Sequence, residues 1–494
     1  MMRPMPSSGP MARRLARLAR RAAAVAAIAL VTVVGLRARE ARRPPGLEPW
    51  HRFAPPSEAT ARELTDAFTL AQYLAREDAV FREVAERIER PLSDAARSPA
   101  NRYNPSGIAT PRRFARDWNR TFELVPPEIR GGALLLHGLT DSPYSMRALA
   151  ELLRDRGFYA LVPRLPGHGT VPGALTRANR ADWLAAARLG ARHVALRAGA
   201  GRPFLLVGYS NGGALAVKYA LDQLDGAGGP RPDSIVLVSP MIRVSRAAAF
   251  AKYLGVLAVF PYFEKTRWLE VVPEYNPFKY NSFPVHAASQ TSLLTSEIRA
   301  QIRRAAADGR LSRMPRLLTF QSVADATVST GAVVRELYAA LPANGSELVL
   351  FDLNRQAIAR PFLRPADEGL LATLIAPPPR RYALTVVTNR DAGTPEVVAR
   401  TYAADRAGPV ERELSAAWPP QVYSLSHVAL PFPSRDPLYG GAPEGEDGAI
   451  RLGVLAPRGE RGVLTVSPDQ FLRISWNPFF AYLAERVARW TAPA

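Results

Sequence analysis

The chain has 494 residues, of which 47% are hydrophobic and 22% charged. This balance is ordinary for a globular protein and excludes disorder as the dominant state. The formal net charge is +20, but the 64 lysines and arginines are scattered among 44 acidic residues, so the excess charge does not indicate a nucleic-acid partner. The chain has no cysteine, which excludes disulfides, thiolate catalysis and cysteine-ligated metals.

Residues 1–43 predict a signal-anchor segment. The basic stretch 11–21 precedes the uncharged apolar run 22–36, which is how a secretory signal begins. The run is short for a membrane span, which needs roughly 20 apolar residues, and Leu36 and Arg37 interrupt the small-residue pattern of a cleavage site. Two interpretations stay open. We favour an anchor that holds the chain on a bacterial inner membrane facing the periplasm; the alternative is a cleaved leader of a periplasmic or secreted protein.

Residues 44–126 predict a linker and a helical N-terminal extension. Residues 41–58 are rich in proline and polar groups, as linkers are. Apolar residues at spacings of three and four predict a helix over 57–90, and Pro91 ends it because proline lacks an N–H group. The turn-forming residues of 93–112 predict irregular structure.

Strands and helices are predicted to alternate over residues 127–494. The expected strands are 133–137, 158–163, 204–208, 234–239, 316–322, 347–351 and 382–388, and the expected helices are 143–156, 181–196, 211–224, 330–341 and 478–490. Apolar strands separated by helices favour an α/β fold, with a mostly parallel sheet covered on both faces. Two segments interrupt the alternation, a helical and aromatic one at 241–311 and a later one at 355–421.

The strongest local signal is Gly208-Tyr209-Ser210-Asn211-Gly212, which joins an apolar strand to a helix. A nucleophilic serine must sit on a sharp, strained strand-to-helix turn so that its hydroxyl projects above the sheet. Side chains two residues before and after the serine would collide in such a turn, so both positions require glycine. The pattern predicts a nucleophile elbow with Ser210 as the nucleophile; the alternative is a plain glycine turn.

A nucleophilic serine requires a histidine base. Where the serine stands on a strand-to-helix turn, the acid and then the histidine follow it in the chain. Of the six histidines, only His286 and His427 follow Ser210. His286 precedes every candidate acid on the resumed sheet, whereas His427 lies after the last major predicted strand and before the closing helix. We therefore expect His427 to be the base.

The acid that orients the base should follow a strand. Asp325 fits, because it follows the strand predicted at 316–322 and precedes a helix. Asp352, at the end of the next predicted strand, is the alternative. An aspartate after a strand can also be only a helix cap.

A hydrolytic serine also needs two backbone N–H groups that hold the developing oxyanion. One is expected from Asn211, the residue after the nucleophile. The other is expected from Leu139, in the loop after the first strand, where Gly138 allows a close approach. His137 is then architectural, not a base.

These motifs, together with Arg164-Leu165-Pro166-Gly167-His168-Gly169, resemble the α/β-hydrolase superfamily over about residues 127–490. The nearest groups are the carboxylesterases, the monoacylglycerol lipases and the serine-aminopeptidase-like proteins. The resemblance implies that 241–311 is a cap whose aromatic residues line an acyl or leaving-group site. It also implies an insertion at 355–421 near the rim of the site, because Asp325 and His427 lie unusually far apart in the sequence.

The sequence thus predicts a serine hydrolase that cleaves carboxylic esters with lipid-like or apolar acyl groups through an acyl-enzyme. The expected partner is a small-molecule or lipid ester, with membrane association through residues 22–36 and no nucleic acid, metal or cofactor. One alternative is an amidase or aminopeptidase on the same fold, which needs an acidic pocket for the substrate amine; the cap offers Glu264, Glu270 and Glu274. Another is a catalytically silent, membrane-anchored binding module.

Overall fold

The computed structural model describes most of the chain beyond residue 44. The described residues are 18, 21, 45–243, 261–325, 327–357, 370–375, 380–404, 408–420, 422, 424–445, 449–453 and 474–492. Except for Leu18 and Arg21, the predicted signal-anchor segment 1–43 lies outside them. In the described part of the chain, no helix has the length and apolar character that a membrane crossing requires.

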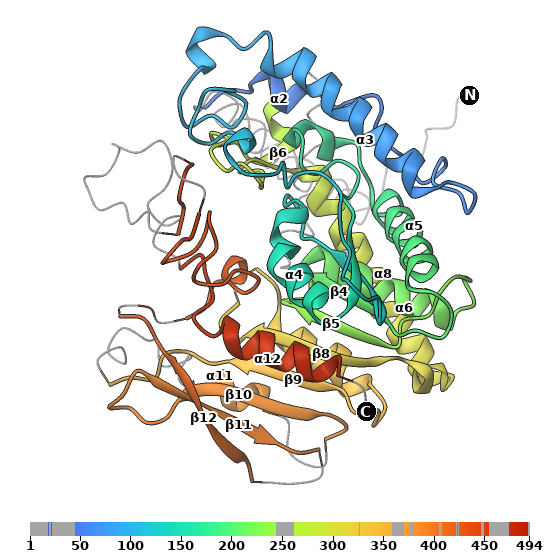
Figure 1. Cartoon of the computed structure of the whole chain (residues 1–494), viewed down its shortest axis with the longest axis vertical. Helices are drawn as coiled ribbons and strands as arrows, with labels where there is room; N and C mark the ends of the chain where they lie inside the picture. Colours follow the sequence, from blue (N-terminus) through green and yellow to red (C-terminus); the bar gives the residue numbers. More distant parts are fainter. Residues whose placement is uncertain are drawn as a thin grey trace, which may run out of the picture.

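One twisted sheet of ten strands organises the molecule (Figure 1). Its strands are β1 (Phe122–Leu124), β2 (Gly131–Leu136), β3 (Phe158–Val162), β4 (Phe204–Tyr209), β5 (Ser234–Val238), β8 (Arg316–Ser322), β9 (Glu347–Phe351), β10 (Ala383–Asn389), β11 (Glu396–Tyr402) and β12 (Val410–Ala417). Their order across the sheet is β1-β3-β2-β4-β5-β8-β9-β10-β11-β12. The strands from β3 to β10 in this order are parallel, and β1, β11 and β12 are antiparallel to their neighbours.

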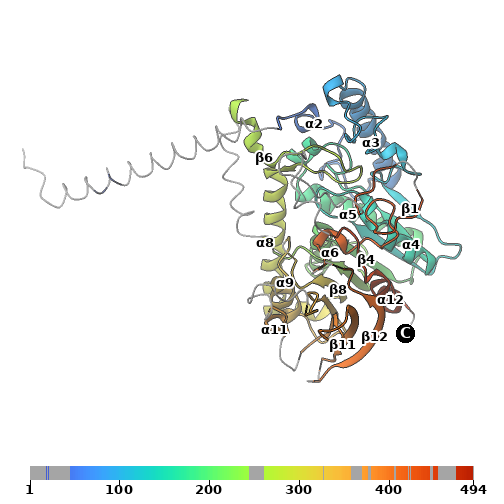
Figure 2. The same ribbon diagram turned by 90° about the vertical axis from the view of Figure 1, so that its left-hand side faces the viewer.

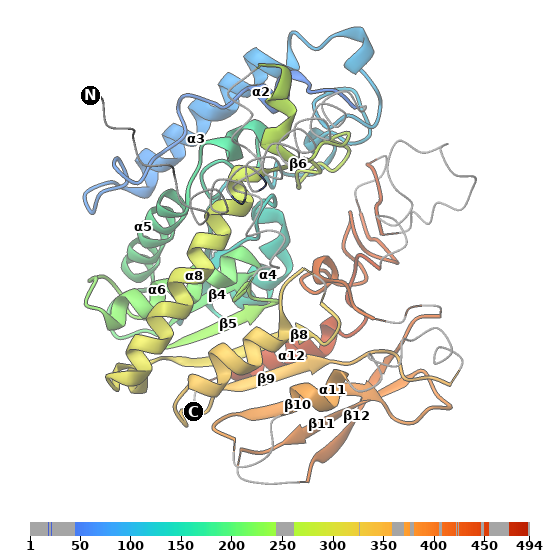
Figure 3. The same ribbon diagram turned by 180° about the vertical axis from the view of Figure 1, so that it is seen from behind.

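Helices cover both faces of this sheet. The main ones are α4 (Arg147–Asp155), α5 (Arg180–Ala198), α6 (Asn211–Leu224), α8 (Val285–Ala307) and α12 (Phe480–Trp490). Side chains alternate along each strand, so that Leu134 and Leu136 join a core with α5, α6 and α8, whereas Leu135 joins a second core with α4 and α12. The first group of helices faces the viewer in Figure 3 and the second in Figure 1. The predicted α/β architecture is confirmed.

The helix predicted over 57–90 begins later than expected, at Leu70. The elements of this region are α2 (Pro49–Arg52) and α3 (Leu70–Val84), and α3 continues as a π-helical turn over Ala85–Glu89. Thr69 caps α3: its side chain accepts a hydrogen bond from the Gln72 N–H, and the Gln72 side chain accepts one from the Thr69 N–H. This reciprocal capping box satisfies the free N–H groups of the first turn and fixes the start of the helix.

The N-terminal extension is joined to the sheet domain by buried charges. Arg164, only 2% exposed, donates to Glu58 at 2.8 Å and to Glu77 at 3.2 Å. Glu77 also accepts hydrogen bonds from the N–H and hydroxyl of Thr121, and Tyr73 of α3 donates to the Arg164 carbonyl. The extension is therefore part of the same folded unit.

The described part of 355–421 extends the sheet. It forms α11 (Leu370–Leu374) and the strands β10, β11 and β12, which lie at the opposite end of the molecule from α2 and α3 (Figures 1 and 2). Strand β10 pairs with β9 and buries Leu384, Val386 and Val387 in the cores on the two faces, so the described part of this segment belongs to the sheet.

The segment predicted as a helical cap divides into two parts. Residues 244–260 lie outside the described residues. The rest begins with a short two-stranded ladder, β6 (Trp268–Glu270) and β7 (Phe283–Pro284), and continues as α8. Leu294, Ile298 and Ile302 of α8 join the same core as α6, so α8 belongs to the helical layer over the sheet and not to a cap above it.

We expect Glu77→Gln to destabilise the protein by about 2–3 kcal/mol, since it leaves the buried Arg164 with one carboxylate fewer. Burial raises the pKa of Glu77, while Arg164 and Thr121 oppose that rise. Urea unfolding measures the loss. Glu128→Gln, which breaks an exposed pair with Arg130, is the control and should change stability by less than about 1 kcal/mol. Equal stabilities of the two variants would contradict this role of Glu77.

Candidate active site

Ser210 occupies a strained turn between β4 and α6. Its φ of 54° and ψ of −116° lie outside the regions that side-chain-bearing residues usually adopt. A Cβ on Gly208 would lie 2.4 Å from the Gly212 carbonyl oxygen, and a Cβ on Gly212 would lie 2.0 Å from the Leu136 carbonyl oxygen. Backbone contacts thus exclude a side chain at both positions, for the reason the sequence pattern suggested.

The structure brings Ser210, His427 and Asp325 together in one hydrogen-bonded chain. His427 Nδ1 lies 2.8 Å from Asp325 Oδ2, and its Nε2 lies 2.9 Å from Ser210 Oγ. A carboxylate can only accept, so Nδ1 carries the proton and donates it to Asp325, which leaves Nε2 to accept the Ser210 hydroxyl hydrogen. The histidine is 7% exposed and the serine 4%, so water hardly competes with these bonds.

Asp325 is held by the turn that follows β8. Its Oδ1 accepts the N–H groups of Thr327 and Val328 at 2.8 and 2.9 Å, and Gln321 Nε2 donates to its Oδ2 at 3.0 Å. Burial favours the protonated acid, but the His427 charge and these hydrogen bonds prevail and hold the pKa of Asp325 below its ordinary value. The carboxyl group is therefore ionised at neutral pH.

Asp352, the alternative acid, is occupied elsewhere. Both of its oxygens accept hydrogen bonds from Arg355, at 2.8 and 3.0 Å, and one also accepts the hydroxyl of Thr388 at 2.8 Å. These contacts tie the end of β9 to β10 and make Asp352 a structural residue.

The loop expected to donate to the oxyanion lies against the nucleophile. A Cβ on Gly138 would lie 3.1 Å from the Tyr209 ring and 3.3 Å from Ser210 Cβ, so the loop approaches the elbow as closely as glycine allows. Leu139 follows directly, and Asn211 is the first residue of α6, where a helix leaves backbone N–H groups without an internal acceptor. Both N–H groups belong to segments beside Ser210.

His137 fixes this loop. Its Nδ1–H donates to the Gly138 carbonyl at 2.9 Å, and its Nε2 accepts the Leu165 N–H at 3.0 Å. Burial lowers the pKa of His137 well below its ordinary value, so the ring is neutral. The structure agrees with an architectural histidine.

Asp436 anchors the loop that carries His427, and sequence reasoning missed it. Its carboxylate is 1% exposed and accepts the Tyr144 hydroxyl at 2.7 Å, Arg147 Nη2 at 3.2 Å, and the N–H groups of Leu438 and Tyr439 at 3.0 and 2.9 Å. Tyr144 and Arg147 lie just after the oxyanion loop. Because these partners are almost 300 residues distant in sequence, no local pattern reveals the contact.

A second buried carboxyl group, Asp141, lies on the oxyanion loop. It is 5% exposed and its Oδ1 accepts the Ser142 N–H at 2.9 Å. Burial raises the pKa of Asp141 to about 6, against the opposing charges of Lys279 and His427.

Three aromatic residues of 261–311, Trp268, Phe278 and Tyr280, are buried in the protein interior. Phe278 stacks on Tyr144 at 4.3 Å, and the Tyr280 hydroxyl donates to the Gly167 carbonyl at 3.0 Å. Trp268 packs edge-on against His51. The expectation that they line an acyl site is wrong for these three residues; Phe250, Tyr253 and Phe260 lie outside the described residues.

The acidic residues considered for an amine pocket have structural partners. Glu264 pairs with Arg52 at 2.9 Å. Glu274 is 1% exposed and accepts the backbone N–H groups of Asn281 and Ser282. Among the described residues, no three histidine, aspartate or glutamate side chains gather in a way that could hold a metal ion.

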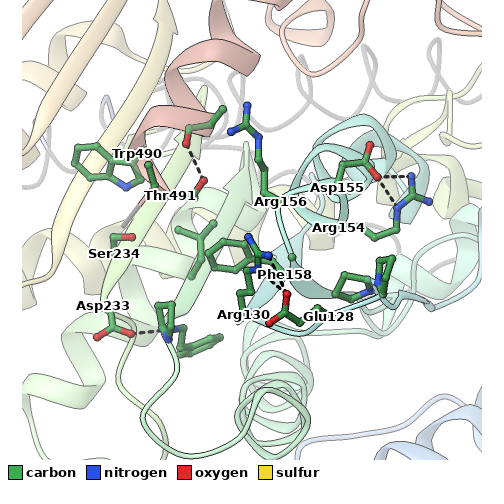
Figure 4. Close-up of a pocket in the computed structure, with 18 of the residues that line it drawn as sticks. Glu128, Arg130, Arg154, Asp155, Arg156, Phe158, Asp233, Ser234, Trp490 and Thr491 are labelled. Carbon is green, nitrogen blue, oxygen red and sulfur yellow. Dashed lines mark hydrogen bonds and ion pairs between the residues drawn. The ribbon is translucent and has the colours of Figure 1, made fainter. Parts of the chain in front are cut away.

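A hollow of about 880 Å³ lies at the other edge of the sheet, where β2, β3, β4 and β5 begin (Figure 4). Two of its four arginines face carboxylates: Arg130 pairs with Glu128 and Arg154 with Asp155. Ligands of parallel sheets bind at the carboxyl ends of the strands, which is the edge that carries Ser210. This hollow is therefore separate from the candidate active site.

A mostly parallel sheet, a serine on a strained strand-to-helix turn, a histidine hydrogen-bonded to that serine and an aspartate hydrogen-bonded to the histidine are features of the α/β-hydrolase fold. The chain has the α/β-hydrolase fold. A family model described as "Serine aminopeptidase, S33" matches residues 127–352, a range that includes Ser210 and Asp325 but ends before His427.

The chain is also similar to individual lipases. It is 28% identical over 179 residues to a thermostable monoacylglycerol lipase from Bacillus sp. (strain H-257), a match that covers 35% of this chain and 65% of the relative. Among solved structures it resembles a metagenome-derived lipolytic enzyme (24% identity, 48% of this chain and 88% of the other, TM-score 0.39). It also resembles the Paleococcus ferrophilus monoacylglycerol lipase (20% identity, 47% and 86%, TM-score 0.35).

We expect Asp436→Asn to lower kcat about tenfold or more with little change in KM, because it removes the charge that faces Arg147 and loosens the His427 loop. Tyr144→Phe, which removes one of the four bonds to Asp436, should have a smaller effect in the same direction. Steady-state kinetics with a chromogenic ester measures both. A thermal melt of each variant shows whether a lower kcat comes from a displaced His427 or from unfolding. An unchanged kcat in folded Asp436→Asn would refute the role of Asp436 in positioning the His427 loop.

Asp141→Asn should make the protein more stable at neutral pH. The folded-state pKa of about 6 lies above the ordinary 3.8, so folding binds a proton and the parent loses stability as pH rises between these values. The loss amounts to as much as about 3 kcal/mol at pH 7.5. Urea unfolding at pH 4 and 7.5 should give equal stabilities at the lower pH and a more stable variant at the higher. Equal stabilities of parent and variant at both pH values would contradict the raised pKa of Asp141.

Proposed function

We propose that the protein is a serine hydrolase that cleaves carboxylic esters through an acyl-enzyme. The observation that carries the proposal is the hydrogen-bonded chain from Ser210 Oγ through His427 to Asp325, with distances of 2.9 and 2.8 Å. These separations are those at which a histidine can take the hydroxyl proton as the serine attacks.

In the proposed reaction, His427 Nε2 accepts the proton of Ser210 while Oγ attacks the ester carbonyl carbon. The N–H groups of Asn211 and Leu139 stabilise the oxyanion, and Asp325 stabilises the imidazolium through Nδ1–H. His427 then protonates the departing alcohol, which leaves Ser210 acylated. A water molecule that gives its proton to His427 attacks the acyl-enzyme, and collapse of the second oxyanion releases the carboxylic acid and returns the proton to Ser210.

The proposed substrates are esters with lipid-like or other apolar acyl groups. The 28% identity to a monoacylglycerol lipase supports this class, although the chain spans only 65% of that relative's length. An aminopeptidase activity is less well supported, because Glu264 and Glu274 are engaged in structural contacts. A catalytically silent binding module would have no need of a strained serine with a hydrogen-bonded base.

The first test is labelling by a fluorophosphonate probe, with hydrolysis of 4-nitrophenyl esters of increasing acyl length measured in parallel. The parent should be labelled, Ser210→Ala should not, and His427→Ala should be labelled far more slowly. Asp325→Asn should lower kcat by roughly 10³- to 10⁴-fold.

Asp352→Asn is the matched control, since it changes the alternative acid, and it should keep ester hydrolysis within a few fold of the parent. Loss of activity in folded Asp352→Asn with retention in Asp325→Asn would reverse the assignment of the acid. Absence of labelling in folded parent would overturn the proposed hydrolase activity. Cleavage of amino-acid amides but of no ester would favour the aminopeptidase.

A further inference from the structure

Arg102 is a buried cation, and among the described residues no carboxylate lies within ion-pair distance of it. It is 4% exposed, and its recorded acceptors are all neutral: the Lys279 carbonyl at 3.3 Å, Asn119 Oδ1 at 3.3 Å and the Gly169 carbonyl at 3.5 Å. Glu274 acts on Arg102 electrostatically, but its own oxygens accept the N–H groups of neighbouring residues.

This arrangement leaves the charge incompletely compensated. A guanidinium group has five N–H donors, and the three long hydrogen bonds of Arg102 use only Nη1 and Nη2 and leave two donors without a protein acceptor. In the described structure, no Arg102 nitrogen is both fully buried and without a partner, so Nε is open to solvent. The Tyr103 and Tyr280 rings lie 5.7 and 5.6 Å from the guanidinium carbon and supply weak cation–π attraction. A buried cation is expensive unless an anion pairs with it.

Arg102 lines a hollow of about 310 Å³ between the N-terminal extension and the sheet domain. Three more arginines line the same hollow: Arg82, Arg112 and Arg120. Arg112 pairs with Glu89, and Arg120 with Asp78 and Asp117. Arg82 is exposed, and no ion pair of it is found among the described residues. The acids in the lining, Glu89 and Asp117, are fewer than the arginines.

We propose that this hollow binds a phosphate group. Its excess of positive charge calls for an anion, and planar guanidinium groups donate in pairs to phosphate oxygens. The volume far exceeds the ≈ 30 Å³ of one water molecule and lies at the lower end of small-molecule sites, so it accommodates a phosphate group with a small organic substituent.

The site joins segments that are distant in sequence. Arg82 comes from α3, Arg112 from the short 3₁₀ helix Pro111–Arg113, and Gly169 and Thr170 from the loop after β3. Through the Lys279 carbonyl, Arg102 also reaches the segment before β7. An anion bound here thus stabilises the contact between the N-terminal extension and the sheet domain.

The test is binding of inorganic phosphate and of glycerol 1-phosphate to the full chain, by calorimetry and by thermal melts at constant ionic strength against chloride. Either ligand should raise the Tm by about 2 °C or more near saturation. Tighter binding of glycerol phosphate would identify a phosphate ester as the natural ligand, and equal affinity would identify free phosphate.

Arg102→Gln should weaken the affinity at least tenfold. Because Arg102 is buried and that variant can fail to fold, the double variant Arg82→Gln/Arg112→Gln, at exposed positions, should weaken it by at least threefold. Arg154→Gln is the matched control and should bind as the parent does. Absence of binding to the parent, or parent-like affinity in the double variant, would overturn the proposal.

Discussion

The strained backbone of Ser210 is the constraint on which the candidate site depends. A positive φ at a serine persists only where the surroundings fix it, and here its N–H donates to the Val238 carbonyl while its carbonyl accepts the N–H groups of Met241 and Ala214. Strand β5 and helix α6 therefore hold the turn from two sides. The glycines at 208 and 212 are the consequence, since the α6 backbone leaves no room for a side chain at 208 and the end of β2 leaves none at 212.

The site also shows how a histidine can be delivered from far along the chain. Three additional strands, β10 to β12, separate β9 from the His427 loop, so the position of His427 cannot follow from a short connection. Long-range contacts supply the position instead. The buried carboxylate of Asp436 ties the loop to Tyr144 and Arg147, and the ring of Tyr209 stacks against the imidazole at 5.3 Å. These contacts hold the His427 loop against Tyr209 and against the segment that follows the Gly138–Leu139 loop.

Charge burial is the second recurring feature of the molecule. Arg164 is paired with Glu58 and Glu77 of the N-terminal extension, whereas Arg102 is buried among neutral acceptors. The contrast matters because the cost of a buried cation depends on its partner. Arg164 joins the extension to the sheet domain. Arg102 lies at the same junction, and its charge is available to pair with a bound anion.

The sequence by itself determined the features that short-range chemistry controls. Gly208, Ser210 and Gly212 specify the elbow because only glycine tolerates the backbone contacts of that turn. The alternation of apolar strands with helices specified the parallel sheet, because each pattern matches one backbone period. Chain order left His427 as the expected base and favoured Asp325, and in the structure His427 bonds Ser210 through Nε2 and Asp325 through Nδ1.

Only the tertiary structure decided what depends on distant partners. The choice between Asp325 and Asp352 followed from which carboxylate faces the imidazole, and the roles of Asp436 and Arg102 followed from neighbours that no sequence spacing reveals. In the sequence, residues 355–421 interrupt the alternation of strands and helices. Their described strands nevertheless extend the sheet, because strand pairing joins backbones irrespective of their separation along the chain. Local patterns record what a residue requires of its immediate neighbours, whereas packing decides which distant neighbours it meets.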